Sequence, residues 1–161
     1  MLTTVRVRPM EVADAHDYLA TIRASIVGVA SQDYPTEVIE GWAPSISDDA
    51  IRLVLENPEG EIRLVGEIEE TILGIGALVL QLNELRACYV SPAGIRRGVG
   101  TAIVRELERI AANHGITHLE LHATITAEPF YRHLGYQSVE KIRHVTSTGV
   151  TMDAIRMSKR L

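Results

Sequence analysis

The residues with the clearest chemical potential lie in one short turn, Arg96-Arg97-Gly98-Val99-Gly100-Thr101. A strand-like run, 85–91, precedes this turn, and a helical pattern, 99–114, follows it. Glycine has no Cβ, so Gly98 and Gly100 allow the chain to turn tightly and to bring backbone N–H groups close to an anion. The positive end of the helix dipole and the two arginine charges add to this attraction. The turn therefore predicts a site for a phosphorylated ligand.

Two common nucleotide sites fit this turn poorly. A Rossmann site needs a third glycine near position 103, where Ile103 stands, and an acidic residue at the end of the next strand, which reads His122-Ala123-Thr124. A Walker loop needs Gly-Lys followed by Ser or Thr, and the sequence contains no such run. A general nucleotide-binding α/β module is therefore the weakest of three interpretations, and competition by NAD or ATP would test it.

The elements around the turn predict an α+β fold. The expected strands are 4–8, 61–68, 71–80, 82–91, 117–124, 136–145 and 150–157, and the expected helices are 11–29, 35–42, 50–56, 99–114 and 127–134. This order favours a mixed, mostly antiparallel sheet of six to seven strands flanked by helices, with parallel strands on either side of helix 99–114. No repeat or linker interrupts the pattern, so we expect one domain over residues 1–161.

Two motifs resemble those of the GNAT N-acetyltransferase superfamily, in particular its small, bacterial-type, single-domain members. The run Tyr89-Val90-Ser91-Pro92, followed by the glycine turn, is similar to the acyl-CoA-binding segment of that family. The later run Ala127-Glu128-Pro129-Phe130-Tyr131-Arg132-His133-Leu134-Gly135-Tyr136 resembles its second signature. The chain departs from the family at Ile95, where a Gln or Arg is usual, and at Thr126, where an Asn is common. The resemblance covers nearly the whole chain and implies the GNAT fold.

The resemblance implies acetyl-CoA as co-substrate and no metal. The pyrophosphate of coenzyme A would lie on the N–H groups of residues 97–101, and its pantetheine would enter between the strands through Tyr89 and Ala123. A backbone N–H near Tyr89 or Val90 would polarise the thioester carbonyl. The implied coenzyme-binding residues are Cys88, Tyr89, Val90, Arg96, Arg97, Gly98, Val99, Gly100, Thr101, Thr124 and Phe130.

Two residues are candidates for proton transfer. An alkylamine has a pKa of about 10.4, so a base must take its proton before it can attack. Glu84 stands where some family members have a catalytic glutamate, but a surface charge beside Arg86 is an equal interpretation. Tyr131 resembles the general acid of the family, and a phenol can donate to the leaving thiolate at neutral pH. The alternative for Tyr131 is packing under the sheet like Phe130.

Four further residues are candidates for binding the acceptor: Tyr34, Trp42, His122 and His144. The segment 25–42 covers the acceptor side in the family fold, and aromatic rings there could bind a cation, although pinning a helix to the core is the simpler role. Either histidine could act as a base near neutral pH, whereas a satisfied, partly buried histidine is the commoner case.

Bulk properties narrow the class of protein. A net charge of −5 with scattered basic residues argues against nucleic-acid binding. The longest apolar run, 73–80, is too short to span a membrane, and a single cysteine suits a reducing cytoplasm, where we expect the protein. The leading interpretation is an acetyl-CoA-dependent N-acetyltransferase whose partner is a small-molecule or peptide amine. A homodimer is possible by resemblance. The alternative is a non-catalytic acyl-CoA-binding or sensing domain of the same fold.

Overall fold

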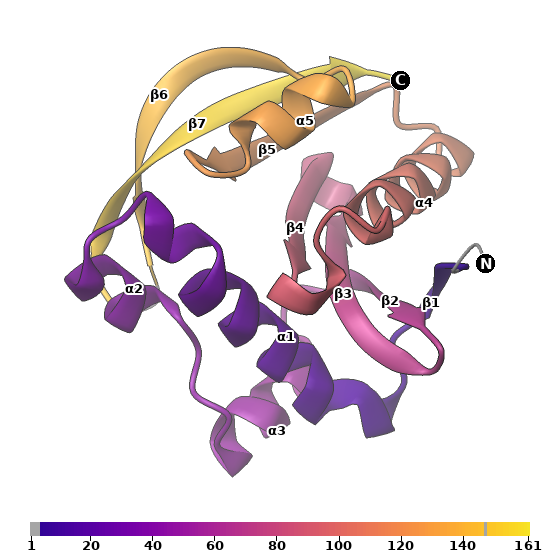
Figure 1. Ribbon diagram of the computed structural model, residues 1–161. Helices are drawn as coiled ribbons and strands as arrows, with labels where there is room; N and C mark the ends of the chain where they lie inside the picture. The colour runs from indigo at the N-terminus through magenta and orange to yellow at the C-terminus, as the bar shows by residue number, and fades with distance from the viewer. Residues whose placement is uncertain (1–3, 147) are drawn as a thin grey trace.

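The computed structural model describes residues 4–146 and 148–161, and one seven-stranded sheet forms its centre (Figure 1). The strands are β1 (Arg6–Pro9), β2 (Ile62–Ile68), β3 (Thr71–Val79), β4 (Glu84–Val90), β5 (His118–Thr124), β6 (Gln137–Val145) and β7 (Thr151–Arg160). They are ordered β1-β2-β3-β4-β5-β7-β6, and every neighbouring pair is antiparallel except β4 and β5. The predicted mixed, mostly antiparallel sheet is confirmed, including the parallel pair.

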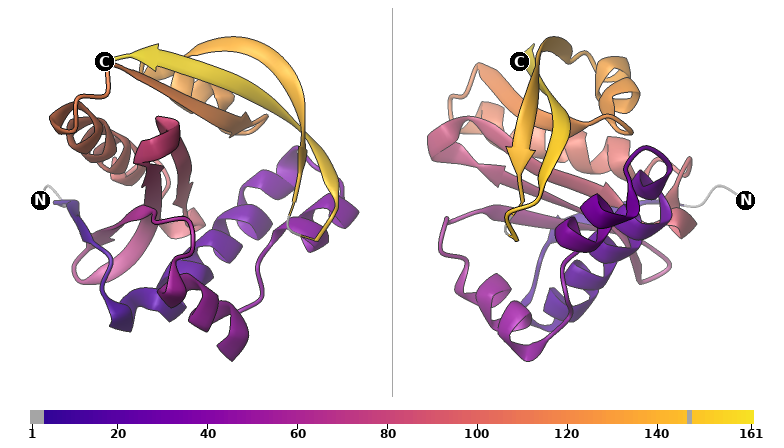
Figure 2. Two further views of the ribbon diagram at one scale, coloured as in Figure 1. Left: turned by 180° about the vertical axis from the view of Figure 1, so that it is seen from behind. Right: turned by 90° about the vertical axis from the view of Figure 1, so that its left-hand side faces the viewer.

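Helices cover both faces of this sheet (Figures 1 and 2). They are α1 (Ala15–Gly28), α2 (Thr36–Trp42), α3 (Asp48–Glu56), α4 (Val99–Asn113) and α5 (Glu128–His133). One core cluster joins α4 and α5 to the sheet, and a second joins α1 and α3 to β2 and β3 on the opposite face. No helix of the described residues is long and apolar enough to cross a membrane.

Two predicted boundaries differ from the structure. The strand expected from residue 82 begins at Glu84, because Leu80–Leu82 form a 3-10 turn that ends at Asn83 with φ 50°. Asparagine tolerates this left-handed conformation, so the chain reverses there between β3 and β4. The helix expected from residue 11 starts as a separate 3-10 turn, Val12–Asp14, before α1.

Glycines on the sheet set the position of α4. A Cβ on Gly76 would lie 2.4 Å from Ile103, and a Cβ on Gly74 would lie 2.6 Å from Val99. Real Cβ contacts of this length do not occur, so only glycine lets the helix approach the strand so closely. The first turn of α4 is thereby held beside the end of β4, where the chemistry is expected.

The sheet opens between β4 and β5. These strands share a single paired position among the described residues, Glu84 with Glu120, supported by a 2.9 Å hydrogen bond from the Glu120 N–H to the Asn83 carbonyl. By contrast, β5 pairs with β7 at seven positions. Within β4, Arg86 is an extra residue between the paired Leu85 and Ala87, which is a β-bulge. The two halves of the sheet therefore part toward the carboxyl ends of β4 and β5, as Figure 1 shows.

The curved β6–β7 hairpin reaches across to α2 (Figure 1). Its end packs so closely that a Cβ on Gly41 would lie 2.2 Å from Val150, and Thr146 Oγ1 donates to the Gly41 carbonyl at 3.3 Å. This contact joins the end of the hairpin to α2.

Candidate active site

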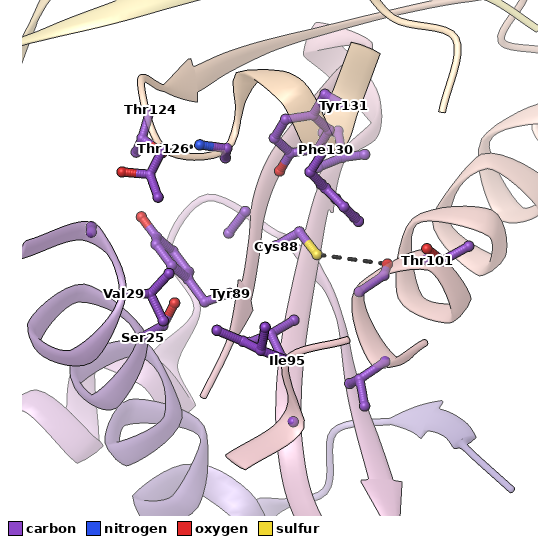
Figure 3. Close-up of a pocket in the computed structure, with 18 of the residues that line it drawn as sticks. Ser25, Val29, Cys88, Tyr89, Ile95, Thr101, Thr124, Thr126, Phe130 and Tyr131 are labelled. Atoms are coloured by element: carbon purple, nitrogen blue, oxygen red, sulfur yellow. Dashed lines mark hydrogen bonds between the residues drawn. The ribbon is translucent and has the colours of Figure 1, made fainter. Parts of the chain in front are cut away.

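A cavity of about 360 Å³ occupies the opening between β4 and β5 (Figure 3). Its walls come from α1 and α2, from β4 and the turn before α4, and from β5 and the start of α5. The predicted residues that line it are Trp42, Cys88, Tyr89, Val90, Arg96, Gly98, Val99, Gly100, Thr101, His122, Thr124, Phe130 and Tyr131. Tertiary structure thus gathers most of the predicted site around one space.

The glycine turn has the geometry of an anion site. Arg96 and Gly98 both have left-handed backbones, with φ of 61° and 82°, and Gly98 is the N-cap of α4. A Cβ on Gly98 would meet no heavy atom of the described chain within 4 Å, so the space in front of the turn is open. The first N–H groups of a helix have no partner within it and point out of its end. The turn therefore fits a phosphate group by its own shape and dipole.

The two arginines of the turn lie differently. Arg96 is exposed and lines the cavity, where it can approach an anionic ligand. Arg97 lies outside the cavity wall, and its Nη1 donates to the Ala93 carbonyl at 3.3 Å. Of the two side chains, Arg96 is the better placed to supply the charge that Ile95 lacks.

Gly100 has a packing role that the sequence did not reveal. A Cβ there would come within 3.1 Å of the Phe130 ring and 3.3 Å of Val90. The Cys88 thiol donates to the Gly100 carbonyl at 3.9 Å. Burial raises the pKa of Cys88 to about 12, so the thiol stays protonated at neutral pH and is a weak nucleophile. Cys88, Gly100 and Phe130 thus form a closely packed wall.

Tyr131 points its hydroxyl into the cavity, toward Cys88 (Figure 3). Its ring is buried and stands edge-on to Phe130 and to Tyr136, with ring centroids 5.1 Å and 5.7 Å away. Burial raises the pKa of Tyr131 well above its ordinary value, and the nearby Cys88 and Tyr89 add to this effect. The phenol is therefore protonated at neutral pH and can act as a hydrogen-bond donor.

Aromatic side chains form the wall at the α1–α2 end. Trp42 and Tyr89 line the cavity with ring centroids 6.2 Å apart, and burial raises the pKa of Tyr89 to about 12. Tyr34 packs edge-on against Trp42 but lies outside the cavity wall. Its hydroxyl donates to the Asp153 carbonyl at 2.6 Å and accepts from the Ile125 N–H at 2.8 Å. Tyr34 thus ties the segment before α2 to β7 and to the residue that follows β5, and its position outside the cavity wall gives no support to direct contact with an acceptor.

Glu84 and His144 also lie outside the cavity wall. Both carboxylate oxygens of Glu84 accept from Arg86, at 2.9 Å from Nε and 3.1 Å from Nη2. Arg86 itself lines the cavity. His144, on β6, stands edge-on to His122, with ring centroids 6.2 Å apart. Among residues 4–146 and 148–161, no three His, Cys, Asp or Glu side chains form a group that could hold a metal ion.

Several wall residues were not singled out in the sequence: Ser25, Val29, Ala30, Arg86, Ala87 and Gly94. Ser25 and Val29 are one helical turn apart, so helical spacing in the covering segment was the signal that could have found them. Arg86 carries no such signal, because the β-bulge that displaces it is invisible in the residue pattern.

A family comparison agrees with this geometry. Residues 18–161 match the model of the acetyltransferase (GNAT) domain. The chain belongs to the GNAT N-acetyltransferase family. A curated relative, the uncharacterized N-acetyltransferase YafP of Escherichia coli K12, is 22% identical over 142 residues, which cover 88% of this chain and 87% of YafP.

Solved structures show the same fold. A GCN5-related N-acetyltransferase from Rhodopseudomonas palustris has a TM-score of 0.89 at 26% sequence identity. The match covers 100% of this chain and 98% of the Rhodopseudomonas chain. PaiA N-acetyltransferase from Thermoplasma acidophilum, solved with coenzyme A, has a TM-score of 0.75 at 20% identity over 98% of this chain and 99% of its own. The yncA protein from Salmonella typhimurium, a putative acetyltransferase solved with acetyl-CoA, has a TM-score of 0.69 at 15% identity over 98% of this chain and 94% of its own. The prediction of a GNAT acetyltransferase is confirmed.

Proposed function

We propose that this chain is a single-domain enzyme that transfers the acetyl group of acetyl-CoA to a primary amine by direct attack. The observation that carries the proposal is the opening between β4 and β5, which has the glycine turn at one end and the Tyr131 hydroxyl in its wall. The fit rests on the chain's own shape: the Gly98 cradle is open, and it lies at the start of a 15-residue helix.

Unpaired backbone groups of β4 support the proposed binding of coenzyme A. Beyond Glu84, β4 has no paired position with β5 in the described chain, so the groups of Cys88, Tyr89 and Val90 that face β5 can hydrogen-bond to pantetheine as an added strand would. A free N–H at this position can also polarise the thioester carbonyl, an effect worth about 2.7–4 kcal/mol where one such donor has been removed from an enzyme. The N–H groups at the start of α4 and the Arg96 guanidinium hold the pyrophosphate.

Tyr131 acts on the leaving sulfur. An alkyl thiol has a pKa of about 8.5, so a thiolate does not readily take the proton of a phenol whose own pKa lies well above 10. Tyr131 therefore stabilises the departing thiolate by donating a hydrogen bond, with the proton remaining mainly on the phenol. This role is narrower than that of a general acid.

The acceptor approaches from the end of the cavity bounded by Ser25, Val29 and Trp42. The Trp42 and Tyr89 rings offer apolar faces to the carbon body of an amine and attract its ammonium group. We assign no direct proton transfer to Glu84, because its carboxylate is bound to Arg86 outside the cavity.

Calorimetry with acetyl-CoA, followed by a thiol-release assay over a panel of amines, tests this function. The panel contains n-butylamine, benzylamine, spermidine, the free amino acids and a peptide with an N-terminal alanine. We expect acetyl-CoA to bind and at least one amine to release coenzyme A. Binding without release over the whole panel would favour an acyl-CoA sensor, and absence of binding would refute the site itself.

A further inference from the structure

Resting on the function proposed above, we propose that His122 is the base that receives the proton of the acceptor ammonium group, and that His144 positions the His122 imidazole. His122 is an exposed residue of β5 and belongs to the cavity wall, on the strand that forms one side of the opening. The proton acceptor of the reaction would then be a side chain of the cavity wall itself.

The case for His122 begins with the other ionisable groups in that wall, which are Cys88, Tyr89, Tyr131, Arg86 and Arg96. Arginine stays protonated at all relevant pH values and cannot accept a proton. The pKa of Cys88 and that of Tyr89 are raised to about 12 by burial, and that of Tyr131 is raised well above 10. All three are therefore protonated near neutral pH. His122 is the remaining ionisable side chain of the described wall, and imidazole is the side chain that most often serves as a proton acceptor in enzymes.

The nearby carboxylates lie outside the cavity wall. Three of them are engaged by arginines, and a fourth, Asp33, accepts a hydrogen bond from Thr126 Oγ1 at 2.7 Å. Glu84 pairs with Arg86, and both Glu120 on β5 and Glu140 on β6 pair with Arg156 on β7, each at 3.0 Å. Arg156 is the cross-strand neighbour of His122. Each of these carboxylates would have to give up an ion pair or, for Asp33, a hydrogen bond, and move into the cavity before it could reach the acceptor.

His144 reaches His122 because the β6–β7 hairpin is strongly curved (Figure 1). Its ring stands edge-on to His122 at 6.2 Å, with an interplanar angle of 67°. Burial lowers the pKa of His144, the charge of His122 lowers it further, and Glu84 and Arg86 on β4 act on it in opposite directions. His144 is therefore held neutral, and its ring can support the His122 ring without placing a second positive charge beside it.

The proton and electron balance of the step is as follows. A ring nitrogen of His122 takes one proton from R–NH3⁺, which leaves a neutral amine and an imidazolium. The amine nitrogen forms a bond to the thioester carbonyl carbon, and the C–S bond breaks with its electron pair going to sulfur. The second proton lost by nitrogen neutralises the thiolate, which Tyr131 stabilises by its hydrogen bond. The imidazolium then returns its proton to solvent at the cavity mouth.

A pair of amines distinguishes a base from a residue that only shapes the cavity. An alkylamine is protonated at pH 7.5 and needs a base, whereas methoxyamine is weakly basic and already neutral. The alkylamine of the panel that wild-type enzyme acetylates fastest is compared with methoxyamine for His122→Gln. We expect the kcat of His122→Gln to be about 10²–10⁴-fold below that of the wild type with the alkylamine. With methoxyamine, the kcat of the variant should be close to that of the wild type. The affinity for acetyl-CoA, measured by calorimetry, should be unchanged.

His144→Gln tests the positioning role. We expect a smaller loss of kcat, an unchanged KM for acetyl-CoA, and a displaced acidic limb in the pH profile of kcat/KM. A role confined to packing would leave that limb in place. The matched control is His118→Gln, because His118 is an exposed histidine on the same strand outside the cavity. Its profile should superimpose on that of the wild type.

The outcomes separate this inference from the function on which it rests. Wild-type enzyme that binds acetyl-CoA but acetylates no amine refutes the proposed function, and the inference with it, before any variant is made. Transfer activity that survives His122→Gln, or that falls equally with both amines, overturns the inference alone. If His122→Gln has a lowered melting temperature, His122→Asn takes its place in the same comparison, and the same two results decide.

Discussion

The two ends of the cavity are built in different ways. The coenzyme end comes from two runs of sequence, 88–101 and 124–131, that contain β4, the glycine turn, and the start of α5. The acceptor end combines α1, α2, β4 and β5, whose contributing residues lie between Ser25 and His122. The first end presents mainly backbone groups, and the second presents mainly side chains.

This difference shows what each end can recognise. In the proposed function, backbone N–H groups at the start of α4 and along β4 bind a feature that every acyl-CoA shares, whatever its acyl group. The rings of Trp42 and Tyr89 and the imidazole of His122 can change by substitution while the strands stay in place. Specificity for the acceptor can therefore vary on this fold without loss of the coenzyme site.

The largest expected effect is a loss of acetyl-CoA binding at the coenzyme end. Gly98→Asp places a carboxylate where the pyrophosphate would lie, and we expect acetyl-CoA affinity to fall by about 100-fold or more, since like charges a few ångströms apart repel strongly near a protein surface. Isothermal calorimetry measures the loss. Gly60→Asp is the matched control, because Gly60 also has a positive φ, 63°, with open space around it. Equal affinities in the two variants would contradict the placement of the pyrophosphate.

The next effect lies where the two ends meet. Tyr131→Phe removes the proposed hydrogen bond to the thiolate, and we expect kcat to fall by about 10- to 100-fold, because a hydrogen bond to a charged group is worth about 1.5–3 kcal/mol. The KM for acetyl-CoA should change much less. Tyr136→Phe controls for the loss of a buried hydroxyl. The Tyr136 hydroxyl does not face the cavity, and it donates to the Glu108 carboxylate over a distance of 2.9 Å. Tyr136→Phe should lower the stability of the protein and leave kcat unchanged. A larger loss of kcat in Tyr136→Phe than in Tyr131→Phe would contradict the role proposed for Tyr131.

A third variant loosens the acceptor end alone. Tyr34→Phe removes the hydroxyl that joins the Asp153 carbonyl to the Ile125 N–H. We expect the free energy of unfolding to fall by about 1–3 kcal/mol, the typical cost of leaving a buried polar group unsatisfied. The KM for the acceptor should rise while the affinity for acetyl-CoA stays constant. Urea unfolding and steady-state kinetics measure these effects, and a change in acetyl-CoA affinity of similar size would show that the two ends are not separable.

The smallest effect concerns the pH dependence of stability. Because the folded state holds the pKa of His144 below the ordinary value of about 6.5, the unfolded chain binds more protons as pH falls below that value. Stability therefore falls with decreasing pH from about 6.5 down to the folded-state pKa. His144→Gln should flatten this part of the curve by a small amount, because the residue is exposed and solvent screens its interactions. Urea unfolding between pH 5 and 7.5 measures it, with His118→Gln as the reference that should keep the wild-type slope.

The proposed coenzyme end draws its residues from two short runs, each of which carries a recognisable local pattern. The Gly98–Gly100 spacing, the strand before it and the Phe130-Tyr131 motif indicated the turn and the family from local patterns. Even there, the sequence suggested that Gly100 serves ligand approach, whereas the structure shows that its missing Cβ makes room for Phe130. Arg97 was expected to bind the coenzyme, and its side chain lies outside the cavity wall, where it donates to the Ala93 carbonyl.

The residues of the proposed acceptor end meet only through long-range packing, so residue type and spacing say little about which of them line the cavity. Tyr34 and Trp42 were predicted as a pair, yet Trp42 lines the cavity and Tyr34 ties the segment before α2 to β7. The ion pair that takes Glu84 away from the cavity depends on the bulge at Arg86. Neither outcome follows from residue type or spacing.

By itself, the sequence determined the order of the elements, the mixed sheet, the glycine turn and the family, because each depends on residues within about one helix or strand of one another. Only the tertiary structure decided where β4 and β5 part, which side chains enter the space between them, and that His144 lies beside His122. Those contacts depend on a bulge, on strand curvature and on the packing of distant segments. These features arise when the whole sheet forms and have no signature in any one segment.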